Sequence, residues 1–333
     1  MSKNKCNYVA VGGQALMEGI MMRGPEGTAV SLRLPDGTVE TTMKNFVSIR
    51  KKYKFFNIPV LRGIVSFIES MIFGYKLIME SAEKTSLDFE EENESKLDKW
   101  ITEHFGPKMM AVIGFISAVL GIGLAFVLFM WLPSFLFDLV NNHLANGAIL
   151  GFRAIFEGVI RVIIFIVYMA LVARMKEIRR VYMYHGAEHK TIFCFEHGNE
   201  LTVENIKKEK RFHPRCGTSF IFVTILLSIL VSSVISVLFP DLTQTRALWI
   251  LTKVLITPLI MGIGFEFIQL AGKYPNKLTN LLSAPGLLMQ RITTAEPDDA
   301  IIEVAIEAMK AALSGKVEET SDDSANVDSE KAE

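Results

Sequence analysis

Cysteine is scarce in this sequence. Cys6, Cys194 and Cys216 are the only three among 333 residues. An odd and widely spaced set of this kind excludes a disulfide framework and a C-x-x-C zinc ribbon. The first ten residues are mostly polar and have no apolar h-region, so we expect no cleaved signal peptide. The chain also lacks a G-x-x-x-x-G-K-[ST] loop and a dinucleotide fingerprint, which argues against those nucleotide-binding classes.

An excess of charge of either sign is also lacking. The formal net charge is -1, with 35 basic and 36 acidic residues, so the balance itself neither favours nor excludes nucleic acid. The basic residues are concentrated between positions 174 and 218. Such a cluster beside apolar segments fits anionic lipid head groups or membrane orientation better than nucleic acid. We therefore expect membrane lipid, and no nucleic acid, as a partner.

Long apolar runs are abundant. Half of the residues are hydrophobic and the mean hydropathy is +0.32, more than a soluble domain normally shows. Four runs approach or exceed the ~20 residues that cross a bilayer. They cover residues 109–137, 149–173, 219–239 and 248–270. The sequence therefore predicts a multi-pass membrane protein.

The loops between these runs differ in charge. The 138–148 loop has no lysine or arginine, and the 240–247 loop has only Arg246, whereas the 174–218 loop is rich in both. The positive-inside rule places the 174–218 loop and both termini in the cytoplasm. All three cysteines then face the reducing side and are expected to be free thiols.

The segments around the four runs carry their own patterns. Residues 55–80 are apolar except for Arg62, Glu69 and Lys76 at seven-residue spacing, which indicates an amphipathic helix in the membrane interface or on the bundle. A further span is the lesser alternative, because its charges would lie at depth. Residues 82–99 indicate an acidic linker, and the tail from 316 onward lacks apolar periodicity and is expected to be disordered.

Residues 7–43 indicate β structure. Two short apolar runs flank Pro35-Asp36-Gly37, a turn signal that predicts a hairpin, and an apolar run at 7–11 precedes Gly12-Gly13. Glycines at both ends of the stretch from Gly12 to Gly24 would let the backbone approach another surface closely, and the alternative interpretation of this stretch is a glycine-bordered connector. Near the other end, Pro275 and Pro285-Gly286 are expected to break a partly apolar stretch. Pro297-Asp298-Asp299 opens a last helix that ends at Gly315.

These patterns together predict a mainly α protein. It is a four-span α-helical membrane bundle with a small cytoplasmic α/β portion and an amphipathic interfacial helix. The expected divisions are the N-terminal β portion, the interfacial helix with its linker, spans 1–2, a motif loop, spans 3–4, C-terminal helices and an acidic tail. Their boundaries are 1–54, 55–108, 109–173, 174–218, 219–270, 271–314 and 315–333.

The motif loop contains Tyr184-His185-Gly186-Ala187-Glu188-His189-Lys190. On a helix, residues four apart share a face, so His185 and His189 could bind one ion, with Glu188 as the base for a bound water. Read as H-x-x-E-H, the motif is an inverted form of the zinc-peptidase signature. The alternative without a metal is a polar helix near the membrane whose histidines only make local hydrogen bonds.

A third metal ligand has four candidates: Glu18, His213, Cys216 and Glu266. His213 and Cys216 belong to His213-Pro214-Arg215-Cys216-Gly217, which follows an expected strand at 191–195 that would turn the chain back. Read alone, Cys216 is more typical of a small packed residue at a helix start. If the second span continues as a straight helix, His185 lies ~18 Å above the membrane, where Glu266, at the cytoplasmic end of the fourth span, could not reach it. Either the helix breaks near Gly186, or Glu18 or His213 is the ligand.

The second span carries Arg153, Glu157 and Arg161 at four-residue intervals. Charges in a span normally face the bundle interior with a partner. The favoured interpretation is an ion-pair ladder within one helix that fixes packing, because the other spans offer few matching charges. The alternative is a polar conduit or a site for a substrate head group.

Three motifs of this chain resemble the YqhQ-like family of bacterial membrane proteins. They are the stretches Gly12 to Arg23, Tyr184 to Lys190 and His213 to Ser219. The resemblance runs from about residue 8 to residue 312. It implies a bacterial inner or plasma membrane location. Members of that family are often labelled predicted metal-dependent enzymes.

Two classes of function follow from these observations. The first is a membrane-bound zinc-dependent hydrolase at the cytoplasmic face, with peptide bonds as its candidate substrate. The second is a non-catalytic scaffold or biogenesis factor whose cytoplasmic polar cluster binds a protein partner or lipid head groups. Transport through the charged second span is a third and weaker hypothesis.

Overall fold

The computed structural model describes residues 11–85, 116–213, 216–273 and 277–317. Several expectations fall outside these residues. They are the apolar run at 7–10, Cys6, the linker at 86–99, the start of the first span at 109–115, Pro275 and the tail from 318.

The N-terminal part is an antiparallel sheet with strand order β1-β2-β3-β4. Its strands are β1 Gly12–Leu16, β2 Gly19–Arg23, β3 Thr28–Arg33 and β4 Val39–Lys44. The predicted hairpin at Pro35-Asp36-Gly37 is confirmed: Gly37 takes a positive φ of 86°, and the Asp36 carboxylate accepts a hydrogen bond from the Thr38 N–H. The interpretation of the Gly12 to Gly24 stretch as a connector is wrong. It forms a second hairpin, whose two-residue turn places Glu18 at a positive φ of 47°.

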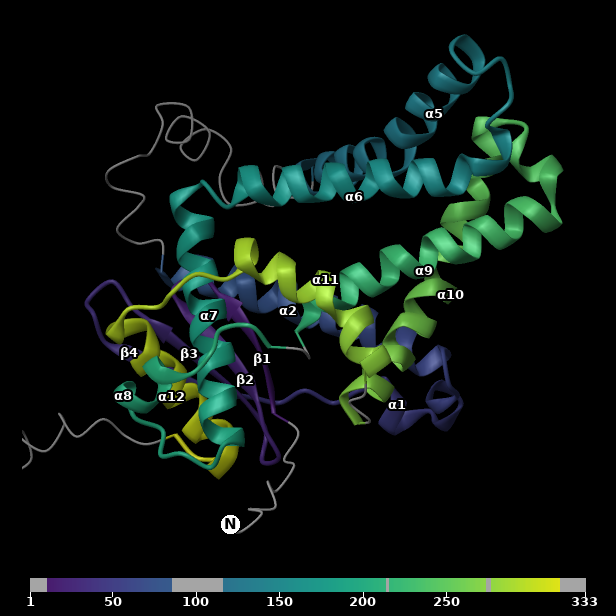
Figure 1. Cartoon of the computed structure of the whole chain (residues 1–333). Helices are drawn as coiled ribbons and strands as arrows, with labels where there is room; N and C mark the ends of the chain where they lie inside the picture. The colour runs from purple at the N-terminus through teal and green to yellow at the C-terminus, as the bar shows by residue number, and fades with distance from the viewer. Residues whose placement is uncertain (1–10, 86–115, 214–215, 274–276, 318–333) are drawn as a thin grey trace, which may run out of the picture.

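Four described helices are long and apolar enough to cross a membrane. They cover Ile116–His143, Leu150–Val172, Phe220–Leu238 and Arg246–Leu270, within a few residues of the runs predicted from hydropathy. Their helical elements include α5 Leu132–His143, α6 Arg153–Val172, α9 Gly217–Leu238 and α10 Arg246–Lys273. In Figure 1 they extend to one side of the molecule, away from the sheet. Mainly α architecture with a small α/β part is therefore confirmed.

The amphipathic segment forms a helix, α2 Leu61–Thr85, after two short turns of helix, α1 Ile49–Lys52 and η1 Lys54–Asn57. It packs on α10, and Gly63 allows the close approach, since a Cβ there would lie 2.8 Å from the Gly262 carbonyl oxygen. This helix is not among the described helices that meet the length and apolarity of a span. Of the two predicted placements, in the membrane interface or on the bundle, its packing on α10 agrees with the second.

A sharp turn at residues 173–175 separates α6 from α7 Lys176–Glu196 (Figure 1). The chain therefore does not continue as one straight helix above the membrane, and α7 instead packs on β1, β2 and α12. The strand expected at 191–195 is wrong, because α7 runs through it. Thr191, Ile192 and Cys194 are all buried there, so tertiary packing on more than one face of the helix outweighs the β-branched local sequence.

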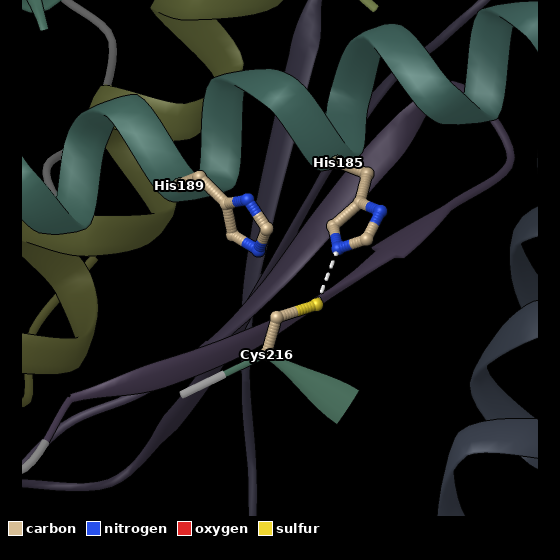
Figure 2. A group of neighbouring side chains, drawn as sticks. All are labelled: His185, His189 and Cys216. Carbon is tan, nitrogen blue, oxygen red and sulfur yellow. Dashed lines mark hydrogen bonds between the residues drawn. The ribbon is translucent and has the colours of Figure 1, made fainter. Parts of the chain in front are cut away.

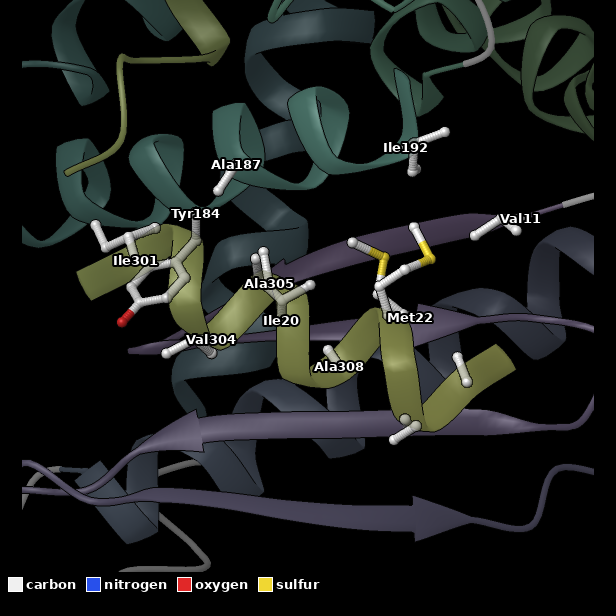
Figure 3. Close-up of a cluster of buried hydrophobic side chains, with 14 residues drawn as sticks. Val11, Ile20, Met22, Tyr184, Ala187, Ile192, Ile301, Val304, Ala305 and Ala308 are labelled. Atoms are coloured by element: carbon white, nitrogen blue, oxygen red, sulfur yellow. The ribbon is translucent and has the colours of Figure 1, made fainter. Parts of the chain in front are cut away.

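The last helix, α12 Asp299–Ser314, begins and ends as predicted. The Asp298 side chain accepts a hydrogen bond from the Ile301 N–H, and Gly315 closes the helix with a φ of 69°. It packs beside α7 on the sheet, against β2, β3 and β4, and its apolar face fills the main core with Ile20, Met22 and Tyr184 (Figure 3). Two further helices are α8 Val203–Lys208, which contacts α7 and α12, and α11 Lys277–Thr293, which packs on α9. The break expected at Pro285 is wrong, since α11 continues through it.

Candidate metal centre

Three side chains converge at the junction of α7 and the start of α9. His185 and His189 lie one turn apart on α7, and Cys216 immediately precedes α9. One ligand atom from each lies within 4.8 Å of the others. Figure 2 shows both imidazoles pointing toward the Cys216 side, where His185 Nε2 lies 3.1 Å from the sulfur. This geometry matches an ion-sized site made by two histidines and a thiol.

The two imidazoles are held in the same tautomer. His185 Nδ1 lies 2.8 Å from the Thr293 carbonyl oxygen, and His189 Nδ1 lies 2.5 Å from the Arg211 carbonyl oxygen. A carbonyl oxygen can only accept, so each Nδ1 carries the proton and donates it. Each Nε2 is left with a lone pair directed toward Cys216. Backbone carbonyls that orient histidine ligands in this way are the usual surroundings of a metal site.

Burial favours the neutral form of His189 and His213. It lowers the pKa of His189, against the opposing effects of Cys216 and the Arg211 carbonyl. It also lowers the pKa of His213 to about 4, against the opposing effect of Glu188. Metals bind the neutral form of imidazole, so low pKa values leave both rings in the binding form at neutral pH.

Gly186 lies inside α7, where glycine costs ~1 kcal/mol relative to alanine. Its surroundings explain why a glycine is needed there. A Cβ at this position would lie 2.0 Å from the Ala295 carbonyl oxygen. The same segment is fixed to α7 by a hydrogen bond from the Ala295 N–H to the Tyr182 carbonyl. Gly186 thus allows the chain after α11 to pack against α7, which places the Thr293 carbonyl beside His185.

Glu188 lies on α7 beside this group, buried against β1. The Gly13 N–H donates a hydrogen bond to it, and a Cβ on Gly13 would lie 2.8 Å from the Glu188 Cγ. Glycine at position 13 is therefore what lets the strand approach the carboxyl group. Burial raises the pKa of Glu188, while His185, His213 and the Gly13 N–H oppose the increase. All three sequence motifs thus contribute to one region.

The structure separates the four candidates for a third ligand. Cys216 joins the histidines. The His213 ring centroid is 5.6 Å from that of His189, and its Nε2 lies 3.7 Å from a Glu196 carboxylate oxygen, outside the three-residue group. Glu18 is bonded instead by Arg180 and Tyr184. Glu266 is bonded by Arg62.

The choice of Cys216 depends on contacts that are distant in sequence. The His213 N–H donates to Gln290 Oε1 at 2.7 Å, and Gln290 Nε2 donates to the His213 carbonyl at 2.8 Å. This pair of hydrogen bonds fixes the backbone just before Cys216 to α11. No local pattern around Cys216 could have shown it, which is why the sequence alone favoured a simple packing role.

A second polar cluster lies among the candidate spans. The Glu157 carboxylate accepts hydrogen bonds from Arg153 Nε at 3.0 Å, Ser134 Oγ at 2.8 Å and Trp249 Nε1 at 3.0 Å. Lys253 of α10 also bonds to it, and Asp138 pairs with Arg153 at 3.1 Å. The expected pair within one helix is present, but the expectation that other spans offer few matching charges is wrong. Lys253 was overlooked because it stands alone in an apolar run.

Arg161, the third charge of the predicted ladder, does not pair with Glu157 by a salt bridge. Its Nε donates to the Phe129 carbonyl at 2.8 Å and its Nη1 to Ser228 Oγ at 3.2 Å. Pro133 lies four residues after Phe129 and has no N–H, so the Phe129 carbonyl lacks its normal helical partner. The proline therefore frees an acceptor that a buried guanidinium uses.

The fold and the site define a helical membrane protein with a polar α/β part that holds a two-histidine, one-cysteine group. The chain belongs to the family described as "Protein of unknown function (DUF1385)", whose model matches residues 58–315. It is 34% identical to "Uncharacterized protein YqhQ" of Bacillus subtilis (strain 168) over 326 residues, which cover 94% of this chain and 95% of that protein. The predicted resemblance to the YqhQ-like family is confirmed. No solved structure matches the chain significantly.

Proposed function

We propose that the protein is a zinc-dependent hydrolase that works at the cytoplasmic face of a bacterial plasma membrane. His185, His189 and Cys216 are the ligands, and Glu188 is the general base. The proposal rests mainly on one observation: two backbone carbonyls fix both Nδ1 atoms, so both Nε2 lone pairs face one thiol sulfur. A thiol donating to a lone pair would satisfy one imidazole, whereas a divalent ion in place of the thiol proton satisfies all three groups.

The surroundings of the group fit a catalytic site better than a structural one. Structural zinc sites use four protein ligands, whereas catalytic sites use three and leave a position for water or substrate. Bound zinc supplies Lewis acidity and lowers the pKa of a coordinated water to about 7. Glu188 is held beside the group by Gly13, and burial raises its pKa, the direction that makes a carboxylate a stronger base.

Elemental analysis of the purified full-length protein tests the metal. Prepared without chelator, it is expected to hold about one zinc per chain, and a His185→Ala/His189→Ala variant is expected to hold none. Replacement of His143, on α5 and outside the site, by alanine is a matched control and should leave the zinc content unchanged. If the wild type holds no zinc, the hydrolase proposal fails. The residues then form a hydrogen-bonded structural cluster, which is what the scaffold hypothesis requires.

Both termini are proposed to lie in the cytoplasm, with α7 and the sheet on that side. The support is the charge difference between the loops, together with the four candidate spans. Cysteines introduced at the exposed positions Asn142 and Asn199 test this orientation in intact cells. An impermeant maleimide is expected to label position 142 and to leave position 199 unlabelled until the membrane is permeabilised. Labelling of position 199 from outside contradicts the orientation.

A further inference from the structure

A cavity of about 640 Å³ opens where α6 turns into α7. Its lining includes Ala173 and Arg174, which directly follow the candidate span Leu150–Val172, so the cavity lies at the end of that span. The opposite wall is the end of α11 and the residues after it, from Arg291 to Glu296. This volume is typical of a site for a small molecule or a head group.

The cavity carries a concentration of positive charge. Four arginines line it: Arg174, Arg179, Arg211 and Arg291. Glu296 also lines it, but its carboxylate is shared by Lys190 at 2.8 Å and Arg211 at 3.6 Å. Within the described part of the chain, the structure shows no ion pair for Arg174, Arg179 or Arg291. Three guanidinium groups are thus gathered around one cavity without a carboxylate to balance them.

Arginine side chains in such an arrangement suit one kind of ligand. A guanidinium presents a planar fork of N–H donors that matches two oxygens of a phosphate, and pairs of this kind are stronger than neutral hydrogen bonds. Beside them, Tyr182, Met183 and Ile292 provide an apolar wall. A ligand with a phosphate and a short apolar part, placed at the end of a membrane span, would satisfy both surfaces.

We propose that this cavity binds a phosphate group, and specifically the phosphate of an anionic membrane lipid. The location at the end of a span favours a lipid over a soluble phosphate, since anionic head groups gather at this depth. The inference does not require zinc, although the cavity adjoins the candidate metal centre. Arg211 lines the cavity while its carbonyl holds His189, and Thr293, whose carbonyl holds His185, lies between two lining residues.

The cavity therefore lies next to the candidate catalytic site of the proposed hydrolase. A phosphate seated on the arginines would lie against the same backbone segments that orient both imidazoles. If the site hydrolyses a bond, the cavity is then the place where a phosphate-bearing amphiphile is held for it. The binding itself is tested separately, so that the two proposals can fail independently.

Binding is measured by titrating dihexanoyl phosphatidic acid into the full-length protein in maltoside detergent, after treatment with chelator. An Arg179→Gln/Arg291→Gln variant removes two exposed and unpaired lining charges. It is expected to bind at least about tenfold more weakly, because each lost contact is a charge-assisted hydrogen bond. A Lys208→Gln/Lys316→Gln variant removes the same charge from exposed positions outside the cavity and is expected to bind like the wild type.

Two further ligands distinguish the source of the phosphate. Dihexanoylglycerol, which has the same chains and no phosphate, is expected not to compete. Inorganic phosphate is expected to compete only at higher concentration, since it lacks the apolar part. Competition at the same concentration as the lipid would support phosphate binding but overturn the lipid assignment. Equal affinity of the wild type and the Arg179→Gln/Arg291→Gln variant, or equal competition by dihexanoylglycerol, overturns the proposal as a whole.

Discussion

Replacing Glu157 by glutamine is expected to lower the free energy of unfolding by about 3–5 kcal/mol, the usual cost of breaking a buried ion pair from one side. The Glu157 carboxylate is almost completely buried, as are its cationic partners Arg153 and Lys253. Its two oxygens accept hydrogen bonds from donors on α5, α6 and α10. An amide can accept at one position only and would leave the buried Lys253 ammonium without its negative charge, whereas Arg153 keeps its pairing with Asp138.

The experiment is thermal unfolding of the purified protein in detergent, which should show a midpoint lower by about 4–7 °C. Glu303→Gln is the matched control, since it removes the acid of the exposed Arg33–Glu303 pair at 3.1 Å. Surface pairs contribute roughly 0–1 kcal/mol, so this variant should stay within a few degrees of the wild type. If Glu157→Gln unfolds no earlier than Glu303→Gln, the cluster does not hold the spans together.

A Glu157→Gln/Lys253→Met double variant separates charge compensation from simple packing. Removing the ammonium as well as the carboxylate takes away one uncompensated charge, and methionine fills a similar volume. We therefore expect the double variant to be more stable than Glu157→Gln alone. A double variant whose loss equals the sum of the two single losses would show that the two charges act independently.

Some features of the fold can be predicted from the sequence because their causes are local. The spans follow from runs of apolar residues, and α12 begins and ends at residues whose side chain and backbone make the caps. The β3–β4 hairpin follows from a turn that needs glycine at a positive φ. In each case the residues that cause the structure lie within a few positions of it.

The incorrect predictions concern features whose causes lie far away in the sequence. Residues 191–195 are helical because α7 is enclosed by α8, α12 and β1, and no local pattern carries that information. The Gly12 to Gly24 stretch is a hairpin whose first strand packs on Glu188, 175 positions away. The α6–α7 turn at 173–175 was also not predicted, although it removes the objection that a straight helix would lift His185 far above the membrane.

One part of the candidate site can likewise be predicted from local sequence, and the other part cannot. The pair His185 and His189 can be predicted from helix periodicity alone, since residues four apart share a face. The third member could not be chosen, because Glu18, His213, Cys216 and Glu266 all lie outside the helix that carries the pair, and only the tertiary fold decides which of them meets it. The structure gives two of them basic partners and leaves Cys216 with the histidines. The sequence did not predict the arginine cavity, because its walls come from α7, from Arg211 and from the end of α11, which are distant in sequence.

Added zinc is expected to stabilise the wild-type protein strongly and a His189→Ala variant hardly at all. A ligand that binds only the folded state contributes about 4 kcal/mol at a thousand times its dissociation constant. For a chain of this size that corresponds to an increase of about 6 °C in the unfolding midpoint. His189→Ala and Cys216→Ala each remove a ligand and should lose most of this increase, measured after chelator treatment and readdition of zinc.

Glu188→Gln distinguishes a base from a ligand in the same experiment. Glutamine keeps the shape of the side chain and its capacity to accept the Gly13 N–H, but it removes the negative charge. If Glu188 acts on bound water and not on the metal itself, the variant keeps the zinc-dependent increase nearly in full. A loss as complete as that of His189→Ala would make Glu188 a metal ligand, or an essential support of one. The general-base assignment would then be wrong even though the protein binds zinc.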